Sequence, residues 1–169
     1  MLQGFQHCGN ILSMLVYNVI MNVTYREYED NDFGELRDMI FCLYAEDPEG
    51  QPIDDAKIAK TINESETHPD KLRIIMIRAD EAVVGYGILV FCWSNEYGGD
   101  ILCIDELYIK KEYRGNRLAS GFIGYLMNTY KNAAAMAVET TPSNEAALKL
   151  YNRLGFEASR NNHLVLPLP

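Results

Sequence analysis

A loop that leads into residues 118–130 has the composition of an anion-binding site. Residues 113–120 are YRGNRLAS, so two arginines and a glycine lie at the start of a helical pattern. The N–H groups of a first helical turn have no partner within the helix, and the helix dipole makes that end positive. The loop and the turn could therefore bind phosphate. An ordinary basic turn between a strand and a helix is the alternative.

Three other side chains could move protons. The phenol of Tyr151, with an ordinary pKa of about 10, stays protonated at neutral pH and could act as a general acid. Asp105 and Glu106 are adjacent carboxylates, and either could accept a proton from a reacting amine, directly or through water. The alternatives are a core position for Tyr151, beside Leu150 and Leu154, and a solvated surface pair for the two carboxylates.

Strands and helices must bring these groups together. Segments that alternate or are rich in β-forming residues predict strands at residues 22–29, 71–79, 82–93, 101–109, 134–140 and 163–168. Asp80 and Glu81 should form the turn of a hairpin between the second and third of these strands. On this pattern, Asp105 and Glu106 point to opposite faces of one strand unless a bulge redirects one of them.

Apolar side chains at three- and four-residue spacing predict a helix from residue 33 to a stop near residues 47–50, and further helices at residues 54–66 and 118–130. A last helix should start at Thr141 and Pro142, with Thr141 as its cap, and end at Gly155 and Phe156. The resulting order, β-α-α-β-β-β-α-β-α-β, predicts a mixed α/β layer fold. Residues 21–169 should form a single domain.

The charge of the chain limits its partners. Its 169 residues include 15 Lys and Arg against 24 Asp and Glu, a net charge of −9 that disfavours nucleic acid and anionic membranes. Cationic small molecules fit this charge better. The four cysteines form no C-x-x-C pair and the three histidines have no metal-site spacing, so we expect no metal site, no disulfide framework and a reducing cytoplasm.

The first twenty residues have a different character. Residues 11–21 are an apolar run with no Lys or Arg before it, and the run is too short to cross a bilayer as a helix. A secretory signal is therefore not expected. We interpret residues 1–20 as a non-essential extension; the alternative is an extra strand or helix packed on the core.

Three blocks in the second half of the chain resemble the GNAT N-acetyltransferases. Residues 113–119 (YRGNRLA) resemble the acetyl-CoA loop of that family, residues 105–109 (DELYI) its bulged fourth strand, and residues 144–156 (NEAALKLYNRLGF) a later helix. The resemblance covers about residue 21 to the C-terminus. It implies the GNAT fold, a twisted and mostly antiparallel sheet flanked by helices. Arg117 replaces the second glycine of the loop pattern, and a normal first helical turn should accommodate it.

The resemblance also implies roles for individual residues. The backbone of Leu107, Tyr108 and Ile109 would pair with the pantetheine arm of acetyl-CoA, and Asn144 would contact the same molecule. Tyr151 would be the general acid, and Asp105, slightly favoured over Glu106, the base. The pyrophosphate would be bound by the loop and the first helical turn, at Arg114, Gly115, Asn116, Arg117, Leu118, Ala119 and Ser120.

These roles predict direct transfer of an acetyl group to a primary amine in a ternary complex. Cys103 has no identifiable histidine partner and should be inert. The acidic residues between positions 96 and 106, and a mild resemblance of residues 91–109 to diamine and polyamine acetyltransferases, favour a cationic small-molecule acceptor. The alternatives are acetylation of a protein N-terminus or lysine and a non-catalytic acyl-CoA sensor. Homodimer formation is left open.

Overall fold

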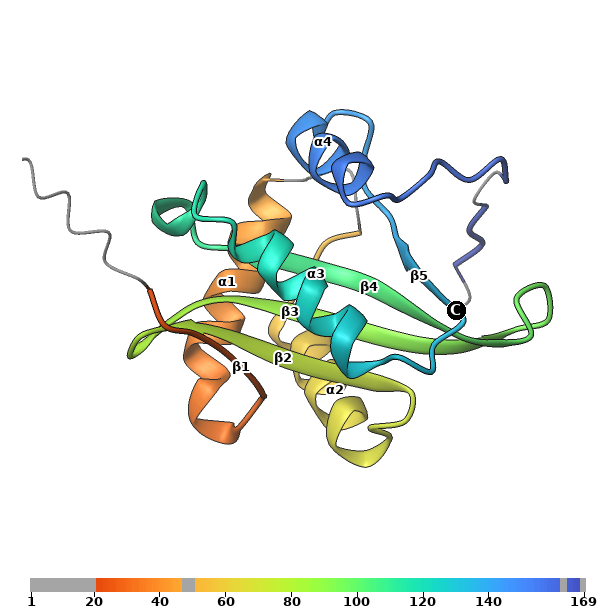
Figure 1. Ribbon diagram of the computed structural model, residues 1–169. Coiled ribbons are helices and arrows are strands. Elements are labelled where there is room, and N and C mark those ends of the chain that lie inside the picture. Colours follow the sequence, from red (N-terminus) through yellow and green to blue (C-terminus); the bar gives the residue numbers. More distant parts are fainter. Residues whose placement is uncertain (1–20, 47–50, 162–163, 168–169) are drawn as a thin grey trace, which may run out of the picture.

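The structure is a computed structural model that describes residues 21–46, 51–161 and 164–167. Within these residues, five strands form one sheet in the order β1-β2-β3-β4-β5 (Figure 1). The strands are β1 (Val23–Glu27), β2 (Leu72–Ala79), β3 (Ala82–Ser94), β4 (Gly99–Ile109) and β5 (Ala135–Val138). The helices are α1 (Phe33–Glu46), α2 (Asp55–Thr67), α3 (Leu118–Thr129) and α4 (Glu145–Arg153). Neighbouring strands are antiparallel except β4 and β5, so the mostly antiparallel mixed sheet predicted from the sequence is confirmed.

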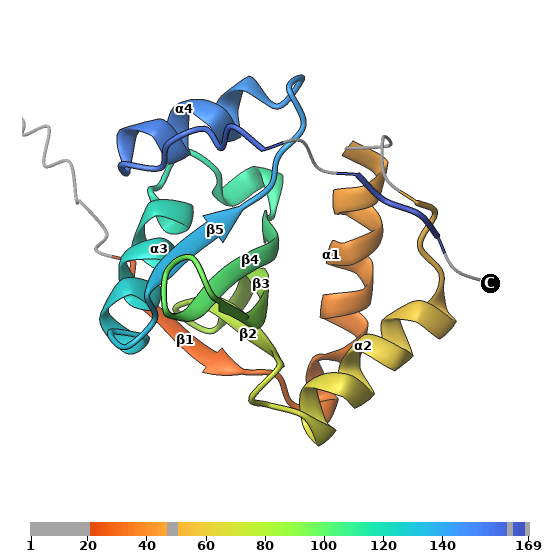
Figure 2. The same ribbon diagram turned by 90° about the vertical axis from the view of Figure 1, so that its right-hand side faces the viewer.

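The sheet separates two hydrophobic cores (Figure 2). On one face, α1 and α2 bury Leu36 and Ile58 against side chains such as Tyr86 of β3. On the other face, α3 and α4 pack against the sheet, with Phe122 and Leu102 fully buried. Burial of one large apolar side chain stabilises a fold by about 1.5–3 kcal/mol, so the two cores together hold the helices in place on the sheet.

β4 contains a bulge, and from the bulge onward it is no longer paired with β5. Ile88 of β3 is paired with Glu106, but the next residue, Leu89, is paired with Ile104, so Asp105 is the extra residue on β4. The bulge predicted at the acidic pair is therefore confirmed. The pairing with β5 ends at Ile104 and Val138, and β5 then diverges from β4 toward α4 (Figure 1). Beyond the bulge, no described strand pairs with the β5-side edge of β4.

Two predictions about the C-terminal part are wrong. Helix α4 begins at Glu145 with Asn144 as its N-cap, so neither Thr141 nor Pro142 starts it. The backbone forms turns from residue 142 to 143 before the helix. Residues 164–167 form no strand, because no described strand pairs with them, and Leu164 is 90% exposed. Residues 163 and 168, the first and last of that predicted strand, lie outside the described residues, as does the predicted extension at residues 1–20.

Candidate active site

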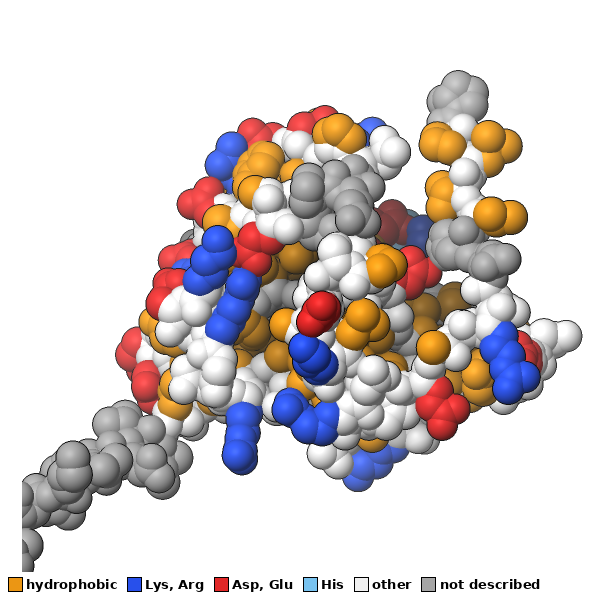
Figure 3. All heavy atoms as spheres, turned by 90° about the horizontal axis from the view of Figure 1, so that it is seen from above, with side chains coloured by type: hydrophobic (Ala, Val, Ile, Leu, Met, Phe, Trp, Pro, Cys, Tyr) orange, Lys and Arg blue, Asp and Glu red, His pale blue; other side chains and the backbone are white. Residues whose placement is uncertain are grey.

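A cavity of about 840 Å³ lies where β4 ends and α3 and α4 begin. Seen from above (Figure 3), a hollow with hydrophobic side chains inside it lies on a face that also carries Lys and Arg side chains. We call it the α3–α4 cavity. Its lining is Leu43, Glu46, Leu107, Tyr108, Ile109, Arg114, Gly115, Arg117, Leu118, Ala119, Ser120, Asn144, Ala146, Ala147, Leu150, Tyr151 and Arg153.

Most of the site residues predicted from the sequence line this cavity, and three do not. Asn116 belongs to the same loop, but its side chain donates a hydrogen bond to the carbonyl oxygen of Tyr113 (3.0 Å). Asp105 and Glu106 lie at the bulge, directly before the cavity-lining residue Leu107. The predicted site is therefore divided between a cavity and the adjoining bulge.

The loop before α3 has an unusual backbone. Gly115 has a φ of 84° and Arg117, the N-cap of α3, has a φ of 61° and a ψ of 16°. The expectation that Arg117 fits a normal helical turn is wrong, since it is left-handed, the conformation that glycine adopts most easily. This geometry turns the chain so that the first N–H groups of α3 lie beside the cavity, where they suit an anion.

Arg114 is held by contacts that the sequence did not predict. Its Nη2 lies 2.8 Å from Oε2 of Glu46, and its Nε donates to the carbonyl oxygen of Ile109 (2.8 Å). The guanidinium group also lies over the ring of Tyr108, 5.2 Å from its centroid. Glu46 is at the end of α1 and is 68 residues away in sequence, so no local pattern could have revealed this pair.

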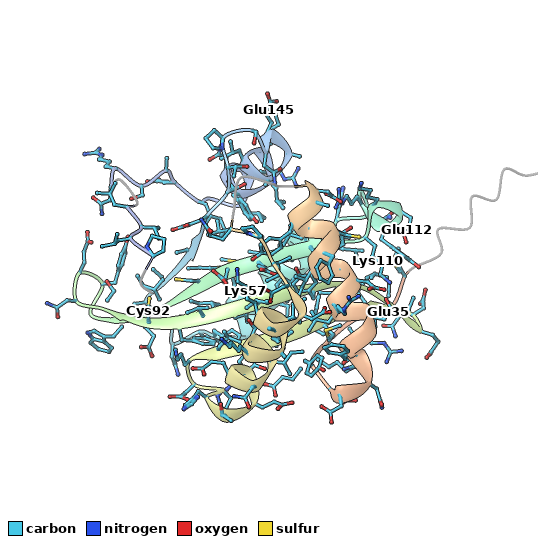
Figure 4. All side chains as sticks on the ribbon, turned by 180° about the vertical axis from the view of Figure 1, so that it is seen from behind. Glu35, Lys57, Cys92, Lys110, Glu112 and Glu145 are labelled. Carbon is cyan, nitrogen blue, oxygen red and sulfur yellow. The ribbon has the colours of Figure 1, made fainter. Side chains whose placement is uncertain are left out.

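The cations around the loop differ in their partners. They are Lys110, Lys111, Arg114 and Arg117. Lys110 pairs with Glu35, beside which it lies in Figure 4, and Nζ of Lys111 is 3.5 Å from Oε1 of Glu46. Arg117 makes no ion pair with the residues that the structure describes. Its positive charge is therefore the least compensated of the four, and Arg117 is one of the residues that line the α3–α4 cavity.

Helix α4 supplies Tyr151 and Asn144. The two residues are seven positions apart and therefore on one face of the helix, and both line the α3–α4 cavity. Oδ1 of Asn144 accepts a hydrogen bond from the N–H of Ala147 (3.1 Å), which fixes the start of the helix. Tyr151 is only 9% exposed, its ring packs against Phe156, and burial raises the pKa of its phenol. The phenol is thus a proton donor at neutral pH.

The two carboxylates at the bulge have different surroundings. Glu106 accepts hydrogen bonds from the hydroxyl groups of Tyr44 (3.0 Å) and Tyr86 (2.7 Å). Burial raises the pKa of Glu106, although the two hydrogen bonds oppose this shift. Desolvation and the nearby charge of Glu139 raise the pKa of Asp105. Sequence patterns did not single out Tyr44 or Tyr86, because each lies within a predicted apolar helix or strand and reaches Glu106 only in the folded chain.

Cys103 lies beside another thiol. Its Sγ is 4.0 Å from Sγ of Cys92, and burial raises the pKa of Cys103 to about 11. A thiol with this pKa is a poor nucleophile at neutral pH because little thiolate is present. In the described residues, no group of three or more His, Cys, Asp or Glu side chains could hold a metal ion. No helix among them is long and apolar enough to span a membrane.

Comparisons with known proteins agree with this geometry. Residues 26–156 match the model of the acetyltransferase (GNAT) family. Over 75 residues the chain is 32% identical to thialysine N-epsilon-acetyltransferase of Bos taurus, a match that covers 43% of this chain and 44% of that protein. The chain thus spans less than half the length of this relative.

Solved structures share the fold. A possible acetyltransferase from Clostridium difficile 630 superposes with a TM-score of 0.75 at 21% identity, covering 87% of this chain and 98% of the other. AAC(6')-Iy, solved with the bisubstrate analogue CoA-S-monomethyl-acetylneamine, superposes with a TM-score of 0.67 at 20% identity, covering 88% of this chain and 99% of the other. At these identities the likeness concerns the fold.

Proposed function

The chain belongs to the acetyltransferase (GNAT) family, and we propose that it transfers the acetyl group of acetyl-CoA to a primary amine of a cationic small molecule. The observation that carries the proposal is the α3–α4 cavity. One wall of this cavity is the N-terminus of α3, and another is the α4 face that carries Tyr151. A helix end that suits an anion and a buried proton donor thus line the same cavity.

The residues of the cavity fit acetyl-CoA. The first turn of α3 would bind the pyrophosphate through backbone N–H groups, and nothing lies within 4 Å of the position that a Cβ at Gly115 would take, so the ligand can approach the loop. The edge of β4 at Leu107, Tyr108 and Ile109 would hold the pantetheine arm by backbone hydrogen bonds. Asn144 would contact the same molecule from α4.

Transfer would occur by direct attack. Acetyl-CoA supplies an acyl group activated as a thioester. The amine nitrogen would lose a proton to Asp105 or Glu106, directly or through water, and form a bond with the acetyl carbon while the carbon–sulfur bond breaks. Tyr151 would donate its phenol proton to the sulfur of coenzyme A as the carbon–sulfur bond breaks. Proton exchange with solvent would then restore both groups.

A cationic acceptor suits the charges at the bulge. Asp105, Glu106 and Glu139 lie near one another there, and the whole chain carries a net charge of −9. An acidic opening concentrates cations and orients an ammonium group toward the base. The similar bovine protein is named for an amine, thialysine, and AAC(6')-Iy was solved with an analogue that contains acetylneamine.

The test is thiol release from acetyl-CoA in the presence of a panel of acceptors. The panel contains polyamines, aminoglycosides, free amino acids and peptides, and mass spectrometry identifies the acetylated nitrogen. We expect release with one of the cationic small molecules. Release with peptides alone would contradict the proposed acceptor class. Tight binding of acetyl-CoA without release for any acceptor would instead indicate a non-catalytic sensor.

A further inference from the structure

The side chain of Glu106 is hydrogen-bonded to two elements that are distant from each other in sequence. Tyr44 of α1 donates a hydrogen bond to its Oε1 (3.0 Å), and Tyr86 of β3 donates one to its Oε2 (2.7 Å). Tyr86 is fully buried, and Tyr44 and Glu106 are half-buried. Each carboxylate oxygen therefore has one phenol donor and keeps a further lone pair. A surface ion pair would not have this two-sided geometry.

The bulge decides which face of the sheet Glu106 occupies. Ile104 packs in the core under α3, and in a regular strand Glu106 would share that face because side chains alternate. The extra residue, Asp105, shifts the alternation, so Glu106 lies opposite Ile88 and contacts Tyr86, both members of the core under α1 and α2. The charged group is thus kept out of the apolar core around Phe122.

The position of Glu106 along β4 connects it with the proposed reaction. It follows the last residue that pairs with β5, Ile104, by two positions, and it directly precedes Leu107, which lines the α3–α4 cavity. Glu106 therefore lies where the sheet opens, next to the wall that would carry acetyl-CoA. Asp105 is also there, but it is more exposed.

The groups that act on the ionisation of Glu106 are Tyr44 on α1, Tyr86 on β3 and Asp105 on β4. Two further groups act on these partners: Tyr108 acts on Tyr86, and Glu139 acts on Asp105. The part of α2 in the same core presents Ile58 and Ile62, which do not titrate. Burial and the Glu106 carboxylate raise the pKa of Tyr44 and Tyr86, so both phenols remain donors over the working pH range.

We propose that Tyr44 and Tyr86 are positioning residues that hold Glu106, rather than Asp105, as the carboxylate that takes the proton of the acceptor amine. This inference rests on the proposed transferase function. The two phenol hydrogen bonds fix the side chain of Glu106 and favour its ionised form, and each carboxylate oxygen keeps a lone pair that can accept a proton. In the step itself, the N–H proton moves to an oxygen of Glu106, directly or through water, as the nitrogen attacks the acetyl carbon. The thiolate leaves and takes the proton of Tyr151.

The test compares pH profiles of kcat/KM for one acceptor amine across single variants. Loss of a phenol donor destabilises the Glu106 carboxylate and raises its pKa, and the base works only when ionised. The acid limb should therefore move to higher pH by about one unit in Tyr44→Phe and in Tyr86→Phe. Below the limb the rate should fall about tenfold, and above it the rate should be unchanged. The ionisation of the amine is common to all variants, so it cannot produce the difference.

The direction in which Asp105→Asn moves the acid limb shows which of the two carboxylates is the base. The charge of Asp105 raises the pKa of Glu106, so its removal should move the limb to lower pH if Glu106 is the base. Loss of the limb in Asp105→Asn, with no loss in Glu106→Gln, would make Asp105 the base and overturn the inference. Tyr28→Phe is the matched control, since Tyr28 packs against the same core and has no hydrogen bond to Glu106 among the described contacts.

The remaining outcomes also decide the question. The inference fails if Tyr44→Phe and Tyr86→Phe both keep the wild-type pH profile. It also fails if Tyr28→Phe shifts the acid limb as much as they do, because the two tyrosines would then act only through packing. The KM for acetyl-CoA should not change in Tyr44→Phe, because Tyr44 does not line the α3–α4 cavity. If the wild-type protein releases no thiol with any acceptor, the proposed function itself fails. Wild-type turnover with unmoved limbs rejects the role of the tyrosines alone.

Discussion

In the proposed reaction, the residue that protonates the leaving thiolate must itself be protonated and must reach the cavity, and Tyr151 has both properties. Burial raises the pKa of its phenol, and the residue lines the α3–α4 cavity. We predict that Tyr151→Phe lowers kcat by about 10² while the affinity for acetyl-CoA and the melting temperature stay close to those of the wild type. The ring and its contact with Phe156 remain in this variant. Steady-state kinetics and calorimetry measure the two effects, and wild-type turnover would remove Tyr151 from the mechanism.

Arg117 combines a strained backbone with an uncompensated charge. A non-glycine residue at a φ of 61° is in a conformation that costs about 1 kcal/mol or more. We predict that Arg117→Gly increases the free energy of unfolding by about 1 kcal/mol and, at the same time, raises the KM for acetyl-CoA several-fold at low salt. The difference in KM should shrink at high salt, where exposed charges are screened.

Two further substitutions separate strain from charge at Arg117. Arg117→Lys keeps the charge and the strained backbone, so both the KM and the stability should stay near the wild-type values. Arg117→Asn removes the charge but tolerates the left-handed region, so it should resemble Arg117→Gly in its KM. A KM that is the same in all variants at every ionic strength would show that the charge does not recruit acetyl-CoA.

At the scale of elements, α4 depends on its first residue. Asn144 caps the helix through Ala147, and the same residue lines the cavity. We predict that Asn144→Ala lowers the free energy of unfolding by about 1 kcal/mol, the usual value of a lost cap. Asn144→Asp keeps the cap acceptor but adds a negative charge to the cavity, so it should keep the stability and raise the KM for acetyl-CoA. An unchanged KM in Asn144→Asp would limit Asn144 to a structural role.

The separation of β4 from β5 is followed along β4 by the bulge, which would bind the amine, and by the α3–α4 cavity, which would bind acetyl-CoA. Five consecutive residues of β4 lie beyond its last pair with β5: Asp105 and Glu106 at the bulge, and Leu107, Tyr108 and Ile109 at the cavity. A strand edge without a strand partner has backbone N–H and C=O groups that can bind an extended ligand. The bulge then directs one carboxylate toward α1. One strand can thus serve both substrates of the proposed reaction.

At the scale of the molecule, the described residues from 21 onward include the strands β1 to β5, the two hydrophobic cores and the lining of the α3–α4 cavity. We predict that deletion of residues 1–20 leaves the melting temperature and the turnover nearly unchanged. Thermal unfolding and thiol release of the shortened and full chains test this prediction. A large loss of stability would show that the apolar run at residues 11–21 is part of a core or an interface.

The sequence alone determined the order of the elements and most of the cavity. Helical periodicity and hairpin turns are local signals, so α1, α2, α3 and the strands β1 to β5 could be predicted close to their observed bounds. The blocks at residues 105–109, 113–119 and 144–156 indicated the family. Nearly all the site residues that were predicted and that line the α3–α4 cavity belong to these blocks. Local signals were insufficient where two of them competed, as at Thr141 and Asn144, or where a strand needed a partner, as at Leu164.

Only the tertiary structure decided the partners of the charged groups. Glu46 meets Arg114 across 68 positions, and Tyr44 meets Glu106 across 62, and neither pair follows from periodicity or from a motif. The face occupied by Glu106 also depends on the bulge together with the helices that cover the sheet. These contacts arise because packing brings α1 onto the same stretch of β4, and the energies of hydrogen bonds and ion pairs depend on distances and burial that exist only in the folded chain.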